Sequence, residues 1–114
     1  MSYNVDLSNA IVARAWYWYE TGATYVWGGC SAGYFDCSGF VSYCVTGSYS
    51  RIGTASTFYS WSSVSDPQPG DIVCTTSHCG IYVGGGMMIH AAGSGKGIRY
   101  SAVQSGMKYV RYYG

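Results

Sequence analysis

One cysteine of this sequence lies in a setting that favours nucleophilic chemistry. Cys37 is part of Asp36-Cys37-Ser38-Gly39-Phe40, a polar, turn-favouring stretch that directly precedes an apolar run. A cysteine at the start of a helix lies at the positive end of the helix dipole, where the thiolate is favoured over the thiol. We therefore predict that Cys37 is a reactive thiol.

The sequence also contains the partner that such a thiol needs. It has only two histidines, His78 and His90, and both lie well downstream of Cys37. An imidazole beside a cysteine can take its proton and later return it, which completes a Cys/His pair. These two histidines are therefore the candidate bases.

The segment that contains the histidines is typical of a β-hairpin. Residues 78–83 and 87–90 are extended, largely apolar stretches, and the three glycines at 84–86 lie between them. We interpret these glycines as a three-residue hairpin loop. With such a loop, Val83 is expected to pair with Met87.

This register decides where the histidine side chains point. It pairs Gly80 with His90, and strand alternation then places His78 and His90 on the same face, about 7 Å apart at Cβ. A two-residue loop would move His90 to the opposite face. A single strand histidine is more often structural than catalytic, but two on one face favour a site, and Gly80 leaves that face uncrowded.

The remaining pattern predicts helices followed by strands. We expect a helix from about residue 6 to residue 20, capped by Asp6 or Ser8 and ended by Gly22, and a second helix with Cys37 in its first turn. A short helix is expected over 55–61, in a loop that could border a substrate cleft. Pro67-Gln68-Pro69-Gly70 marks a change to extended structure. The expected strands are 71–74, 79–83, 87–92, 98–100 and 108–112, so the fold class is α+β, with N-terminal helices on a C-terminal antiparallel sheet of about five strands.

Length and charge limit the classes of function. The 114 residues are 48% hydrophobic, which fits a single domain over residues 1–114. The net charge of +1 comes from scattered residues, so nucleic-acid binding is not expected. We expect a monomer that needs no cofactor. The abundant aromatic residues suit a neutral polymer such as peptidoglycan, although most of them should build the core.

No stretch is long and apolar enough to span a bilayer, and the N-terminus lacks the pattern of a signal peptide. We therefore expect no membrane insertion. The chain can still act outside a cell if a leader was removed, if it is one domain of a longer protein, or if phage lysis releases it.

The other cysteines are interpreted as structural. No C-x-x-C pattern occurs, so no metal site is predicted. Cys44 is expected in the core, and Cys79 alternates away from its neighbour His78. Cys74 and Cys79 flank a tight turn, where a disulfide and two reduced thiols are equally compatible with the pattern. Cys30 has no assigned role.

Four blocks of the sequence, in order and spacing, resemble the NlpC/p60 cell-wall cysteine peptidases, which are papain-like enzymes that cut peptidoglycan stem peptides. The similarity extends over nearly the whole chain. The blocks are Tyr25-Val26-Trp27-Gly28-Gly29, Asp36-Cys37-Ser38-Gly39-Phe40, Pro69-Gly70-Asp71-Ile72-Val73, and His78-Cys79-Gly80-Ile81-Tyr82-Val83-Gly84 leading to Ile89-His90-Ala91.

The resemblance implies a role for each matching residue. Cys37 would be the nucleophile, His78 the general base and then acid, and His90 the residue that orients His78. It further implies that Tyr25 borders the nucleophile and that Asp36 and Ser38 shape the substrate site. These last three are the expected substrate-binding residues.

Asp36 has two opposing readings. A carboxylate beside Cys37 should raise the thiol pKa, which would work against a thiolate. Alternatively, Asp36 caps the helix or faces a substrate amine, and capping is as well supported as a role in binding.

The resemblance implies hydrolysis of the bond between the side-chain carboxyl of D-glutamate and the following diamino acid, through a thioester. An N-acetylmuramoyl-L-alanine amidase, or another amide hydrolase with the same Cys/His pair, is the alternative. A wall-binding module without activity is a third possibility. The expected place of action is the bacterial cell wall, reached by secretion or phage lysis.

Overall fold

The computed structural model describes residues 5–114, and the α+β fold class predicted from the sequence is confirmed. The helices are α1 (Ala10–Thr21), α2 (Cys37–Thr46) and α3 (Ala55–Tyr59). The strands are β1 (Thr24–Tyr25), β2 (Cys30–Ser31), β3 (Tyr34–Phe35), β4 (Ile72–Cys74), β5 (Cys79–Gly84), β6 (Met87–Ala91), β7 (Ile98–Ala102) and β8 (Lys108–Val110).

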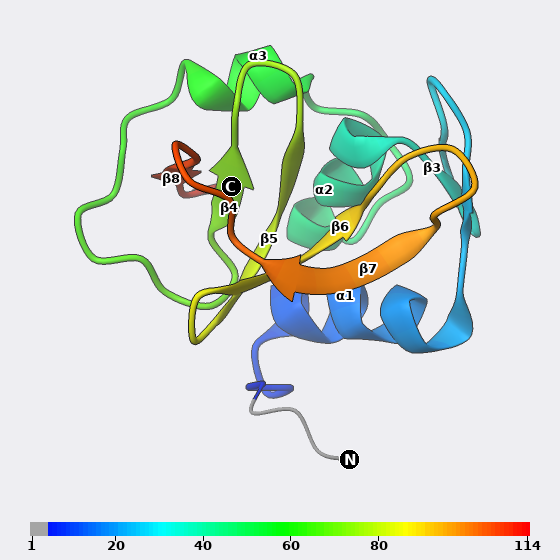
Figure 1. Cartoon of the computed structure of the whole chain (residues 1–114), viewed down its shortest axis with the longest axis horizontal. Coiled ribbons are helices and arrows are strands. Elements are labelled where there is room, and N and C mark those ends of the chain that lie inside the picture. The colour runs from blue at the N-terminus through cyan, green and yellow to red at the C-terminus, as the bar shows by residue number, and fades with distance from the viewer. Residues whose placement is uncertain (1–4) are drawn as a thin grey trace.

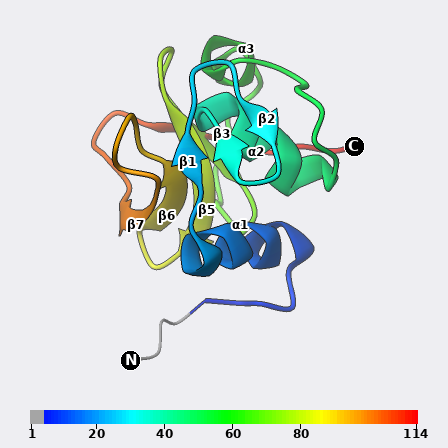
Figure 2. The same cartoon turned by 90° about the vertical axis from the view of Figure 1, so that its right-hand side faces the viewer.

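The C-terminal half forms an antiparallel sheet of five strands in the order β7-β6-β5-β4-β8 (Figure 1). Helices α1 and α2 pack on one face of this sheet, where their apolar residues join those of the strands in the main hydrophobic core. Figure 2 shows the small three-stranded sheet, in the order β1-β3-β2, beside α2. A smaller cluster of Val73, Met88 and Met107 lies apart from the main core.

Helix α1 begins four residues later than its sequence pattern indicated. Asp6 accepts hydrogen bonds from the main-chain and side-chain groups of Ser8, so both expected caps are used in a local turn. Asn9 caps the helix instead, because its side chain accepts hydrogen bonds from the amides of Ile11 and Val12. The helix ends at Gly22 as predicted.

The hairpin between β5 and β6 differs from the prediction at its tip. Tyr82 pairs with Met88, but Gly84 pairs with Met87, so Val83 lies in a β-bulge without a partner. The predicted pairing of Val83 with Met87 is therefore wrong.

The turn itself explains the difference. Only Gly85 and Gly86 connect the strands, with φ of 63° and 77°. A two-residue hairpin turn of this kind needs positive φ at both positions, which glycine adopts without a steric penalty. The loop is thus shorter by one residue than expected, and the bulge adds that residue back to β5.

The bulge preserves the side-chain pattern on the rest of the hairpin. Ile81 lies opposite Ile89, which is the register that the sequence predicted below the tip. His78 and His90 therefore still come together, although the turn has two residues. The expected consequence of a two-residue turn was wrong because it assumed a regular strand.

Candidate active site

Cys37 is the first residue of α2, and several features fix the start of this helix. Asp36 is its N-cap and accepts a 2.8 Å hydrogen bond from the amide of Gly39. A Cβ on Gly39 would lie 2.0 Å from the carbonyl oxygen of Gly29, so only glycine allows α2 to approach this loop so closely. Cys37 is 9% exposed and lies at the positive end of the helix dipole.

The two histidines lie side by side in the fold. His78 Nε2 and His90 Nδ1 are joined by a hydrogen bond of 2.7 Å. His90 Nε2 in turn lies 2.7 Å from the hydroxyl oxygen of Ser101 on β7. The His78 side chain also hydrogen-bonds Cys37. Because His90 occupies Nε2 of His78, the Nδ1 nitrogen is left to face the sulfur.

Cys37 has the electrostatic surroundings of a thiolate. Hydrogen bonds from the Cys79 side chain and from His78 lower the pKa of the Cys37 thiol to about 5, although burial opposes this shift. Burial, together with the nearby charges of His78 and Arg99, lowers the pKa of His90 to about 4. His90 is therefore neutral near neutral pH and can accept a hydrogen bond from His78.

Tyr25 lies at the main chain of Cys37. Its hydroxyl hydrogen-bonds the backbone of Cys37. Burial first, and then the negative charges of Cys37 and Asp36, raise the pKa of Tyr25 above its ordinary value. The hydroxyl therefore keeps its proton and is available as a donor beside the Cys37 amide.

Asp36 is both a cap and one half of an ion pair. Its second oxygen accepts a 2.9 Å hydrogen bond from the amide of Gly28, and its first lies 2.9 Å from Nη2 of Arg51. Arg51 also donates to the hydroxyl of Ser38 and to the carbonyl of Gly29, at 3.3 Å in the second case. The guanidinium therefore offsets the carboxylate beside Cys37.

A cavity of about 330 Å³ opens in front of Cys37. Trp27 stands at its edge with 90% of its surface exposed. Segments from four parts of the chain line it, namely Trp27, Gly28, Asp36, Cys37, Ser38, Arg51, Thr54, Ala55, Ser56, Thr76 and Ser77. The segment before α3 and the start of α3 thus border the cleft, as the sequence indicated.

Three residues of this site have no assigned role in the sequence analysis. Cys79 faces away from His78 as expected, but this orientation places it against the Cys37 sulfur. Arg51 lies in a segment of weak periodicity, where no sequence pattern identifies it as a site residue. Ser101 lies on the part of β7 beyond the expected strand end, and continuing the alternation from Arg99, which pairs with His90, would have found it.

The other thiols lie away from the reacting face. Cys44 is fully buried, and Cys30 Sγ lies 3.5 Å from the carbonyl oxygen of Gly39. All five cysteines fall within residues 5–114, and all are free thiols there, Cys74 and Cys79 included. In the same residues, no three histidine, cysteine or acidic side chains are grouped so that they could hold a metal ion.

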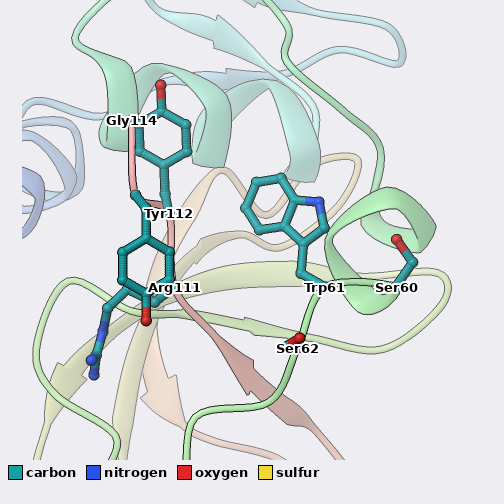
Figure 3. A pocket seen from close by; sticks show the side chains of 7 residues that line it. Ser60, Trp61, Ser62, Arg111, Tyr112 and Gly114 are labelled. Atoms are coloured by element: carbon teal, nitrogen blue, oxygen red, sulfur yellow. The ribbon is translucent and has the colours of Figure 1, made fainter.

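A larger cavity of about 700 Å³ lies elsewhere on the molecule (Figure 3). Trp61 and Tyr112 line it with their rings 6.4 Å apart, and Arg111 lies at its edge. None of its lining residues is Cys37 or a histidine, so it is not the place of the thiol chemistry.

Across residues 5–114, no helix has the length and apolar character needed to cross a membrane.

Comparison with known proteins agrees with this arrangement. A model of the NlpC/P60 family matches residues 22–114. The probable peptidoglycan endopeptidase LytE of Bacillus subtilis is 37% identical over 102 residues, which cover 82% of this chain and 30% of LytE. The probable endopeptidase p60 of Listeria grayi is 42% identical over 86 residues, covering 68% of this chain and 17% of p60.

Solved structures show the same relationship. The NlpC/p60 domain of the peptidoglycan hydrolase SagA is 36% identical, with a TM-score of 0.71 over 90% of this chain and 97% of that domain. NlpC2 from Trichomonas vaginalis is 27% identical, with a TM-score of 0.72 over 96% of this chain and 49% of that one. The chain spans less than a third of the length of LytE and of p60. Sequence and fold together show that this chain belongs to the NlpC/P60 family.

Proposed function

We propose that this chain is a cysteine peptidase domain that hydrolyses amide bonds in peptidoglycan stem peptides. The observation that carries the proposal is the contact of the Cys37 sulfur with His78, supported by His90 and Ser101, at the start of a helix beside an open cavity. Its similarity to LytE, a probable peptidoglycan endopeptidase, and to SagA, a peptidoglycan hydrolase, supports the choice of substrate.

In the proposed mechanism the Cys37 thiolate attacks the amide carbonyl and forms a tetrahedral oxyanion. The main-chain N–H of Cys37 and the hydroxyl of Tyr25 lie together at this point and would donate hydrogen bonds to the oxyanion. The protonated His78 then gives its proton to the leaving amine. Water, activated by the same histidine, hydrolyses the thioester and regenerates Cys37.

His90 acts by holding His78. A neutral His90 accepts a hydrogen bond from His78 at Nδ1 and donates one to Ser101 from Nε2, which fixes both rings. This arrangement also stabilises the charge on His78 after it takes the thiol proton. It corresponds to the orienting role that a carboxylate has in other triads.

We propose that the bond that is cut joins the side-chain carboxyl of D-glutamate to the diamino acid. In this proposal Asp36 and Ser38 contribute to the substrate site as members of the cavity wall, and Tyr25 contributes through its contact with the Cys37 backbone. The direct contacts of Asp36 and Ser38 with Arg51 make this part of the wall rigid, so it can define which peptide fits. We further propose that the chain acts as a monomer at the bacterial cell wall.

An amidase that cuts between muramic acid and L-alanine could use the same residues, because the chemistry of the two amide bonds is the same. A wall-binding module without activity would need no activated thiol, and the lowered pKa of Cys37 argues against it. The exposed ring of Trp27 fits a binding role in either case.

The test is digestion of purified sacculi with the wild type, Cys37→Ala, and Cys44→Ala as a matched control. Cys44 is fully buried on the same helix, so its variant removes a thiol without touching the reacting face. We expect soluble peptide fragments from the wild type and the control, and a loss of at least about 1,000-fold with Cys37→Ala.

Mass spectrometry of products from defined muropeptides then identifies the bond. Fragments that begin with the diamino acid support the endopeptidase, whereas release of free L-alanine termini supports the amidase. Equal digestion by Cys37→Ala, or none by a folded wild type at any pH, would remove the proposal.

A further inference from the structure

A second thiol lies directly behind the nucleophile, where α2 packs on β5. Cys79 is fully buried, and both its side chain and its main chain hydrogen-bond the Cys37 sulfur. Cys37 and Cys79 come from distant parts of the sequence and belong to the same hydrophobic core. The hydrolysis mechanism assigns no step to Cys79.

The two sulfurs differ in their access to solvent. Cys37 lines the cavity, so a small solute reaches it first. Cys79 is not among the residues that line this cavity, and its hydrogen bond to Cys37 and its burial raise its pKa well above the ordinary value. One sulfur thus lies at the cavity wall in surroundings that favour the thiolate, and the other is a buried thiol that hydrogen-bonds it.

Such an arrangement is what reversible oxidation of a cysteine requires. A thiolate that reacts with peroxide forms a sulfenic acid, which either condenses with a neighbouring thiol or is oxidised further and irreversibly. The outcome depends on whether a second thiol is within reach. Cys79 hydrogen-bonds the sulfur that would be oxidised and lies in the same core cluster.

We propose that Cys79 is a resolving thiol for Cys37, so that hydrogen peroxide converts the active site to a Cys37–Cys79 disulfide, which switches the enzyme off reversibly. The proposal rests on the reactivity of Cys37 in the proposed function, but not on the identity of the substrate.

The reaction balances in two steps. The Cys37 thiolate attacks one oxygen of hydrogen peroxide, the O–O bond breaks, and the products are a sulfenic acid and hydroxide. The Cys79 sulfur then attacks the Cys37 sulfur, the S–O bond breaks, and the thiol proton leaves with the hydroxyl group as water. In total, two thiols are oxidised to one disulfide and one peroxide is reduced to two waters.

Cys74 is the competing partner. It lies on β4 directly opposite Cys79. The neighbouring pair, Thr75 and His78, is hydrogen-bonded, because the Thr75 amide donates to the His78 carbonyl. Cys74 and Cys79 are therefore a non-hydrogen-bonded pair, in which side chains lie closest. Burial raises the pKa of Cys74 to about 11, and Cys74 is not among the residues that line the cavity. It is therefore not the first thiol to be oxidised.

The experiment treats the wild type, Cys79→Ala and the matched control Cys74→Ala with hydrogen peroxide, followed by peptide mapping under non-reducing conditions. In the wild type and in Cys74→Ala we expect the Cys37 and Cys79 peptides to be linked, with the loss of two hydrogens. In Cys79→Ala we expect Cys37 to gain two or three oxygen atoms instead.

Reversibility is measured as alkylation of Cys37 by iodoacetamide after treatment with dithiothreitol. It should return in the wild type and in Cys74→Ala, and should be lost in Cys79→Ala. The readout is the ratio of disulfide-linked to over-oxidised Cys37 peptide. The rate of oxidation is not used, because loss of the Cys79 hydrogen bond also slows the first step. Circular dichroism of each variant confirms that it is folded, and the wild-type map decides the question if Cys79→Ala is not.

Over-oxidation of Cys37 in the wild type, to the same extent as in Cys79→Ala, would overturn the proposal. So would a disulfide between Cys74 and Cys79 that leaves Cys37 unlinked. These results do not depend on peptidoglycan, so a linked pair in a protein that digests no sacculi would support this inference while removing the proposed function.

Discussion

At the scale of single residues, the reactivity of Cys37 results from opposing effects. Burial disfavours the thiolate, whereas hydrogen bonds from Cys79 and His78 favour it, and the hydrogen bonds prevail. The carboxylate of Asp36 does not prevent this because Arg51 and the amides of Gly39 and Gly28 use its oxygens. The sequence predicted that the charge of Asp36 would oppose a thiolate at Cys37. Arg51, which the sequence did not single out, offsets that charge.

Cys79 should therefore control the pH dependence of Cys37 alkylation. In the wild type the rate should rise with pH through a midpoint of about 5, because iodoacetamide reacts with the thiolate, which forms above the pKa. In Cys79→Ala the midpoint should move upward, toward the ordinary thiol value, since the largest lowering effect is removed. Site-resolved mass spectrometry of the alkylated peptide measures both.

Cys74→Ala is the control for that comparison, since it removes a neighbouring thiol from the opposite strand. Its midpoint should match that of the wild type. An unchanged midpoint in Cys79→Ala would show that His78 and the helix dipole activate Cys37 by themselves.

At the scale of elements, the close approach of β5 and β6 is what brings the histidines together. A Cβ on Gly80 would lie 2.8 Å from Cβ of His90, which is closer than two such atoms can be. Glycine at this position therefore does more than leave the face open to substrate. It lets the His90 ring lie between His78 and Ser101.

Gly80→Ala should consequently displace His90 while leaving most of the fold intact. We expect kcat/KM to fall by about 100-fold, the order of loss that a displacement of about 1 Å produces in a catalytic group. Turnover of a defined muropeptide, with circular dichroism to check folding, measures this.

Gly106→Ala controls for general destabilisation: its φ of 86° strains any side chain there, nothing lies within 4 Å of the new Cβ, and it is far in sequence from the site. Its activity should stay near that of the wild type. Full activity of Gly80→Ala would mean that His90 is not needed to orient His78.

At the scale of the whole molecule, an ion pair fastens the C-terminal segment to the sheet. Asp71, just before β4, is 2% exposed, and Nε of Arg111, just after β8, lies 2.6 Å from its carboxylate. A second contact of 2.8 Å makes the pair bidentate. The partner carboxylate raises the pKa of Arg111 further above its ordinary value.

Arg111→Met should destabilise the protein, because it leaves the charge of Asp71 buried and unpaired. The double variant Asp71→Asn with Arg111→Met removes that charge and should recover part of the loss. Urea unfolding gives the order of stability, which we expect to be wild type, then double variant, then single variant. A single variant as stable as the wild type would show that water reaches the carboxylate.

The sequence predicted the elements well where local physics dominates. Gly22 ended α1 as predicted, and the apolar runs from Ile72 onward became the expected strands. The hairpin tip failed because a bulge at Val83 is a property of two strands together, which a single strand pattern does not contain. The cap of α1 moved to Asn9 because a local turn had already used Asp6.

By itself, the sequence determined the candidate nucleophile and the candidate bases, since Cys37, His78 and His90 are identified by residue type, local pattern and motif. The partners of these residues were decided only by the tertiary structure. Arg51 beside Asp36, Ser101 beside His90 and Cys79 beside Cys37 are contacts between segments far apart in the chain. Such contacts depend on how helices and strands pack, which periodicity along one segment cannot encode.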